Sequence, residues 1–131
     1  MTVRKSQTYD NLLLLKDAAP STATGAAQVA GAARVLDMGD QAGMGVVKAV
    51  VDVASVGGTT PTQSVAIQGS VDLAFTTPVQ LGAGPTAAIA GRQEIGFTND
   101  QAGVMYRYIR AFITLGGTTP SVSSIIYVTK A

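Results

Sequence analysis

The fold of this chain is decided by residues 105–130, which read MYRYIRAFITLGGTTPSVSSIIYVTK. Two runs rich in β-branched and aromatic residues flank the turn-forming sequence Gly116-Gly117-Thr118-Thr119-Pro120, a pattern typical of strands joined by a hairpin turn. The same five residues occur as Gly57 to Pro61, again between a valine-rich run and an alternating run. The sequence predicts one hairpin design used twice, although two generic turns of common composition would give the same pattern.

The closing hairpin is expected to pair Met105–Leu115 with Ser123–Lys130. Alternation along its first arm gives an aliphatic face, Ile109, Ala111, Ile113 and Leu115, and an aromatic face, Tyr106, Tyr108, Arg110 and Phe112. Neither face is plainly polar, so we expect one to cover the core and the other to contact an arm or a neighbouring subunit. The aromatic face is therefore the candidate subunit or capsid interface. Arg107 and Arg110 are expected on opposite faces, with at least one paired to a carboxylate at a subunit boundary.

Further strands are expected at Leu12–Leu15, Arg34–Met38, Gly45–Ala54, Ser64–Phe75, Val79–Leu81 and Arg92–Phe97. The alternation of the fourth run sends Val65, Ile67, Gly69, Val71, Leu73 and Phe75 to the core. The run Ala18–Ala33, rich in small side chains, is expected to be mostly loop, with a helix over Ala27–Ala33 as the alternative. Roughly eight short strands with frequent turns predict an all-β sandwich or barrel, and two long hairpins at corresponding places suit a jelly roll.

A chain of 131 residues fits one domain. Met1–Asp10 is polar and lacks a period, so we expect an extended N-terminal arm followed by a single β-sandwich domain over residues 11–131. No apolar run has the length of a signal-peptide core or of a membrane-spanning helix. We therefore expect a soluble protein that is made in a cytoplasm and has no membrane partner.

The composition argues against catalysis and metal binding. The chain has no cysteine and no histidine, which removes thiolate ligands, thiol nucleophiles and imidazole bases together. Asp37 with Asp40, or Asp52 with Asp72, would be the acidic pairs for a hydrolase, but the sequence brings neither pair together. No calcium-loop or phosphate-loop spacing is present. We expect no enzyme activity, no catalytic residues, no cofactor and no metal.

The charge is low and balanced. Only 13% of residues are charged, and the formal net charge is +1. No dense block of Lys and Arg is available to neutralise phosphates, which disfavours a nucleic-acid partner. So few charges suit a subunit covered by its neighbours, although an ordinary surface rich in Ser, Thr and Gln fits as well.

Three segments carry a resemblance to a known family. They are Val35-Leu36-Asp37-Met38-Gly39 after an Ala- and Thr-rich lead, Gln68–Leu81 with its spacing of Ser70, Asp72, Phe75, Pro78 and Leu81, and Arg107-Tyr108-Ile109-Arg110. With these segments the chain resembles the small jelly-roll capsid cement, or decoration, proteins of tailed bacteriophages.

The resemblance implies a structural virion protein without catalysis. It implies a jelly-roll subunit, commonly a homotrimer, that binds the outer surface of an icosahedral phage head and stabilises contacts between major capsid protein subunits. Its location would be the capsid exterior. The alternative is a β-sandwich binding module of a tail or adhesion protein, in which Tyr106, Tyr108 and Phe112 stack on a glycan or another surface ligand.

Overall fold

The computed structural model describes residues 13–38 and 47–130, and this part of the chain is nearly all β, with no helix among its elements. The strands are β1 (Leu14–Lys16), β2 (Gly25–Ala26), β3 (Gln28–Val29), β4 (Ala32–Ala33), β5 (Leu36–Asp37), β6 (Val47–Ser70), β7 (Val79–Ala83), β8 (Gly91–Phe97), β9 (Asp100–Gln101), β10 (Val104–Met105) and β11 (Tyr108–Lys130). Seven of them form one curled sheet, while β3 with β4 and β9 with β10 form two small hairpins. The expected arm, Met1–Asp10, lies outside the described residues.

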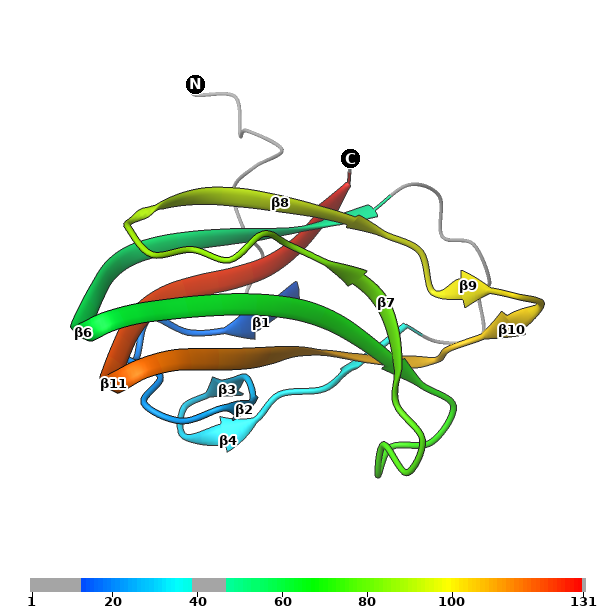
Figure 1. Ribbon diagram of the computed structural model, residues 1–131. Coiled ribbons are helices and arrows are strands. Elements are labelled where there is room, and N and C mark those ends of the chain that lie inside the picture. The colour runs from blue at the N-terminus through cyan, green and yellow to red at the C-terminus, as the bar shows by residue number, and fades with distance from the viewer. Residues whose placement is uncertain (1–12, 39–46, 131) are drawn as a thin grey trace, which may run out of the picture.

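Two long antiparallel strands, β6 and β11, dominate the sheet. They pair along their whole length, from Val47 opposite Lys130 to Ser70 opposite Tyr108. Both strands bend sharply at their Gly-Gly-Thr-Thr-Pro sequences and run back, so the two-stranded ribbon is folded on itself (Figure 1). The predicted pairing of Met105–Leu115 with Ser123–Lys130 is therefore wrong. Each half of β11 pairs with a half of β6. The five-residue sequence bends a continuous strand, and it does not form a hairpin in which the two halves of β11 would pair with each other.

The two copies of this sequence form the corner of the ribbon, and they lie opposite each other. Thr59 is the register partner of Thr118, and the ladder is irregular on both sides of this pair. The backbone repeats as well: φ is positive at Gly58 and Gly117, and again at Thr60 and Thr119. A Cβ built on Gly58 would lie 2.6 Å from the carbonyl oxygen of Thr119. The repeat is thus structural, with each copy shaped to pack against the other.

Folding of the ribbon creates two layers. Layer A contains residues 47–56 and 122–130, flanked by β8 on one edge and β1 on the other. Layer B contains residues 62–70 and 108–115, flanked by β7 on one edge and by β2 and β5 on the other. The N-terminal part therefore covers the β11 side of the fold, and β7 and β8 cover the β6 side. Strands were expected near all of these places except β2, where loop was expected.

The core lies between the layers and takes alternate side chains from both. Its buried members include Ala49, Val51 and Val53 from layer A, and Val65, Ile67, Ile109 and Ile113 from layer B. A smaller cluster, Leu14, Val50 and Tyr127, lies on the outside of layer A, with Val29 and Ile125 packed against it. The outward-facing Val50 of β6 is thus covered in part by N-terminal residues of the same chain.

One part of the predicted core is wrong. Val65 and Ile67 are buried as expected, but Val71 and Leu73 are 63% and 64% exposed. The strand ends at Ser70, before Thr77-Pro78, and period-two alternation holds only while a strand continues. Phe75 is buried, yet it belongs to neither hydrophobic cluster. It lies instead outside layer B, against Arg110.

Candidate functional site

Three of the four predicted interface residues share the outer face of layer B. Tyr108, Arg110 and Phe112 alternate along β11 with Ile109, Ala111 and Ile113, whose side chains are buried in the core. All three outward side chains are half-buried. Across the ladder they face Ser70, Gln68 and Ala66 of β6, which are small or polar. We call this set, together with Phe75, the outer face of layer B.

Tyr106 does not belong to this face. It is packed against the core, and a Cβ built on the inward-facing Gly69 would lie 2.8 Å from the Cβ of Tyr106. The prediction counted alternation back through Arg107, but β11 begins only at Tyr108. The outward orientation predicted from alternation is therefore found for Tyr108, Arg110 and Phe112 and not for Tyr106.

Arg110 lies at the centre of the outer face. Its Nε donates to Oε1 of Gln68 at 2.9 Å, and its guanidinium carbon lies 4.3 Å from the ring centroid of Phe75 and 5.9 Å from that of Phe112. Burial lowers the pKa of the Arg110 guanidinium. Within residues 13–38 and 47–130, no acidic side chain forms an ion pair with it. Among the described residues, the guanidinium is contacted by two aromatic rings and one side-chain amide and by no carboxylate.

Arg107 is paired within the chain. Its Nε and Nη2 donate to the two carboxylate oxygens of Asp37 at 2.8 and 3.0 Å, a bidentate arrangement. Asp37 is the register partner of Tyr108, so the ion pair lies on the outer side of layer B, where the Arg107 guanidinium is 5.4 Å from the Tyr108 ring. Arg107 therefore reaches the same side as Arg110, contrary to expectation.

A tight turn over residues 71–78 places Phe75 on Arg110. The carboxylate of Asp72 accepts hydrogen bonds from the hydroxyls of Ser70 (2.7 Å) and Thr76 (2.6 Å) and from the Thr76 amide (3.3 Å). The hydroxyl of Thr76, followed by that of Ser70, lowers the pKa of Asp72. Phe75 itself takes a positive φ of 53°. The turn presents Val71 and Leu73 to solvent, and sequence alternation missed this apolar patch.

A hollow of ≈ 580 Å³ adjoins the outer face. It is lined by Leu13, Leu73 and residues 33–38, which include Leu36, Asp37 and Met38. Asp37, which lines the hollow, is the register partner of Tyr108, so the hollow lies close to the tyrosine. It joins the N-terminal part of the chain to the turn that follows β6, and these segments are far apart in the sequence, which is why no local pattern indicated it.

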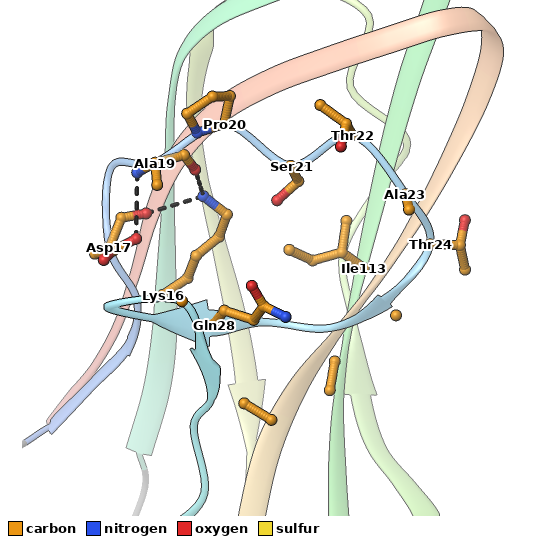
Figure 2. Close-up of a pocket in the computed structure, with 14 residues that line it drawn as sticks. Lys16, Asp17, Ala19, Pro20, Ser21, Thr22, Ala23, Thr24, Gln28 and Ile113 are labelled. Atoms are coloured by element: carbon orange, nitrogen blue, oxygen red, sulfur yellow. Dashed lines mark hydrogen bonds between the residues drawn. The ribbon is translucent and has the colours of Figure 1, made fainter.

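A second hollow of ≈ 370 Å³ lies under the loop that follows β1 (Figure 2). Lys16 extends into it and donates from Nζ to the backbone oxygens of Asp17, Ala19 and Ser124 at 2.9, 2.6 and 2.8 Å. Three acceptors match the three donors of an ammonium group. Burial lowers the pKa of Lys16, and Asp17 opposes this. With its hydrogen-bonding capacity used, Lys16 fastens the loop to β11.

Of the two acidic pairs considered from the sequence, only Asp52 with Asp72 lies wholly within the described residues, and the fold does not bring these two together. Asp37 is bound to Arg107, and Asp40 lies outside the described residues. Asp52 is exposed on layer A, whereas Asp72 holds the turn that follows layer B. Across residues 13–38 and 47–130, no group of three or more His, Cys, Asp or Glu is placed to hold a metal ion. In the same part of the chain, no helix has the length and apolarity to span a membrane.

The fold and the face together define an all-β chain with a curled sheet and a mixed aromatic and cationic outer face. No protein-family model matches the chain, and no curated protein matches it.

Proposed function

We propose that this protein is a structural virion protein, a capsid cement or decoration protein that binds the outside of a phage head and stabilises contacts between major capsid protein subunits. One observation carries the proposal. The three sequence segments that resemble this family, around Asp37, Gln68–Leu81 and Arg107–Arg110, meet on one surface, through the Arg107–Asp37, Arg110–Gln68 and Arg110–Phe75 contacts.

The folded ribbon supports the finer expectation of a jelly roll. In that fold a long antiparallel pair is wrapped so that its halves fall in two facing layers. The β6–β11 ribbon is folded in this sense, with the corner at Thr59 and Thr118. We propose a jelly-roll subunit that assembles as a homotrimer, is made in the host cytoplasm and resides on the capsid exterior, and that has no enzymatic role.

The outer face of layer B suits a passive clamp. Aromatic rings and arginine are enriched at protein interfaces, where they combine a large contact area with directional polar groups. Half-buried Tyr108, Arg110 and Phe112 are already partly ordered by neighbours in the chain, so binding costs less side-chain entropy. Area buried across several subunits would then stabilise the head.

Add-back to heads that lack the protein tests the proposal. The wild-type chain should co-sediment with the heads and raise the temperature at which they release DNA. Arg110→Gln should bind at least about tenfold more weakly, because a hydrogen-bonded charged group in an interface typically contributes more than about 1.4 kcal/mol. Arg92→Gln, on an exposed strand of layer A, is the matched control and should bind as wild type. Failure of the wild type to co-sediment, or heads of unchanged heat resistance, would remove the proposal.

The aromatic residues on the outer face of layer B support one alternative function, glycan binding. Tyr108 and Phe112 flank Arg110 on an outward face with Gln68 beside them, which resembles the mix of rings and polar groups that bind sugars. A glycan array probed with the free protein separates the two functions. Specific glycan binding that Tyr108→Ala abolishes, in a chain that still folds, would favour the binding module over the capsid protein.

A further inference from the structure

We infer that the outer face of layer B recognises a carboxylate of a partner protein, presented by an extended segment that also inserts an apolar side chain into the adjoining hollow. The inference deepens the proposed function, since the partner would be the capsid subunit, and it names the chemistry by which that subunit is recognised. It rests on three features of the described residues: the unused donors of Arg110, the fixed plane of its guanidinium, and the apolar surroundings.

The first feature is hydrogen-bonding capacity. Arg110 uses its Nε–H on Gln68, which leaves four N–H groups on the two terminal nitrogens. Among the residues that the structure describes, no acceptor is bound to these four groups and no carboxylate pairs with the charge. By contrast, nearby Arg107 is engaged in its bidentate pair with Asp37. Among the described residues, the outer side of layer B therefore carries one arginine that is paired with a carboxylate, Arg107, and one whose terminal N–H groups have no bound acceptor, Arg110.

The second feature is preorganisation. The Phe75 ring lies over the guanidinium at 4.3 Å, and Gln68 fixes its Nε edge at 2.9 Å. Phe75 is held in turn by the hydrogen bond from its amide to the Asp72 carbonyl, 3.2 Å, within the 71–78 turn. A planar fork that is already oriented and partly desolvated matches the two oxygens of a carboxylate and loses little entropy on binding.

The third feature selects a protein as the source of the carboxylate. Val71 and Leu73 are strongly exposed on the turn that carries Phe75, and Leu73 also lines the hollow with Leu13 and Met38. An inorganic anion would leave these apolar side chains in water. A protein segment with one apolar side chain beside its acidic residue would cover these exposed apolar side chains and pair with Arg110 at the same time.

Strand geometry gives the spacing of the two groups. Arg110 and Tyr108 are two residues apart on the same face, a separation of about 7 Å. Asp37 lines the hollow and is the register partner of Tyr108. An extended partner segment that lies along β11 would therefore place its apolar side chain about two residues from its carboxylate. This predicts a pattern of apolar residue, any residue, acidic residue, read in either direction.

A titration of the isolated full chain tests the inference without phage heads. The probe is a capped pentapeptide of threonine with leucine at its second position and glutamate at its fourth, and its twin has glutamine in place of glutamate. Binding is followed by the ¹⁵N NMR shifts of the Tyr108 and Phe112 backbone amides, which every variant retains, and in the wild type also by the shift of the Arg110 Nε–H. The glutamate peptide should bind at least about tenfold more tightly than the twin, because charge-assisted bidentate bonds are the stronger kind. Arg110→Gln should abolish this preference, and Arg92→Gln should retain it.

Leu73→Ser separates the apolar contact from the carboxylate contact. It should lower the affinity for both peptides and leave the ratio of the two affinities unchanged. Arg110→Lys keeps the charge without the planar fork, and it serves as the second variant if Arg110→Gln fails to fold.

Equal binding of the two peptides, or a preference that survives Arg110→Gln, would overturn the inference. Inorganic phosphate that competes as well as the glutamate peptide would make the face a free-anion site. Self-association by light scattering that Arg110→Gln abolishes would make the occupant a second copy, with exposed Asp52 or Asp100 as the acidic group. The add-back to heads tests the capsid function independently. If the chain recognises the glutamate peptide but does not bind heads, the carboxylate site stands and the capsid function is removed.

Discussion

At the scale of single residues, Lys16 does more for the fold than its type suggests. Its ammonium joins three backbone oxygens, one of them the buried carbonyl of Ser124 in β11. Lys16→Met keeps the side-chain volume but leaves these acceptors without their donor. We expect a loss of about 2–4 kcal/mol in the free energy of unfolding, measured by urea titration. The matched control is Lys48→Met, which removes only a partly exposed pair with Glu94 at 3.1 Å and should cost less than about 1 kcal/mol. Equal losses would show that the three carbonyl bonds contribute little.

Gln63 has the opposite effect on stability at the same scale. It is buried near the corner, its Oε1 is 3.5 Å from the hydroxyl of Ser124, and within the described residues its Nε2 has no hydrogen-bond partner. The equivalent position after the second Gly-Gly-Thr-Thr-Pro copy holds the buried Val122. Gln63→Met removes the unsatisfied amide at similar volume and should stabilise the fold by about 1 kcal/mol. A fall in Tm, measured by thermal unfolding, would refute this.

At the scale of elements, the corner of the β6–β11 ribbon depends on two glycines. Gly58 and Gly117 have φ of +111° and +93°, and a Cβ on either would meet the backbone of the opposite copy. Gly58→Ala or Gly117→Ala should therefore cost at least about 2 kcal/mol or prevent folding. Gly91→Ala, in β8, has an ordinary φ and open space around its Cβ. This control should change stability by less than about 0.5 kcal/mol in the same urea titration. Similar costs at all three positions would contradict the proposed role of the corner.

The same corner shows what the sequence predicts and what it does not. Alternation identified the strand content, the inward Ile109, Ala111 and Ile113, and the outward Tyr108, Arg110 and Phe112, because burial repeats every second residue. It did not identify the strand partners. Gly, Thr and Pro favour positive φ and broken ladders whether a chain reverses in a hairpin or bends within a strand, so local composition leaves long-range pairing undetermined.

The 71–78 turn is an element whose stability should depend on acid. Hydrogen bonds from Thr76 and Ser70 lower the pKa of Asp72 in the folded chain below its usual 3.8. A depressed carboxyl pKa contributes stability that is complete above the unfolded value and is lost as pH falls through the folded value. Asp72→Asn should therefore flatten the decline of stability below pH ~4, with Thr76→Val intermediate, as read from urea midpoints across this range. A decline identical to wild type in Asp72→Asn would show that the turn is not held by its carboxylate.

At the scale of the whole molecule, the proposed interaction site is a product of tertiary structure. Phe75 and Leu73 were predicted to lie in the core, and only the early end of β6 at Ser70 brings one onto Arg110 and the other to the hollow. The end itself follows from Asp72, whose carboxylate binds Ser70 and Thr76 and so competes with the ladder. The hydrogen bonds of Asp72 favour a turn, whereas the apolar alternation favours a longer strand. The alternation pattern contains no information on the strength of these hydrogen bonds, so it predicts the strand end wrongly.

The folded ribbon also makes the two layers inseparable. β6 and β11 each run through layer A, the corner and layer B, so neither layer can open without disrupting the strands of the other. We therefore expect one cooperative unfolding transition, as for a single domain. In a Tyr9→Phe background the remaining tyrosines are Tyr106 and Tyr108 at the layer B end and Tyr127 in layer A, and their fluorescence should give the same urea midpoint as far-UV circular dichroism. Adding Tyr127→Phe restricts the fluorescence signal to layer B, and the two midpoints should still coincide. Separate midpoints would mean that the layers unfold independently and that the ribbon is not continuous through the corner.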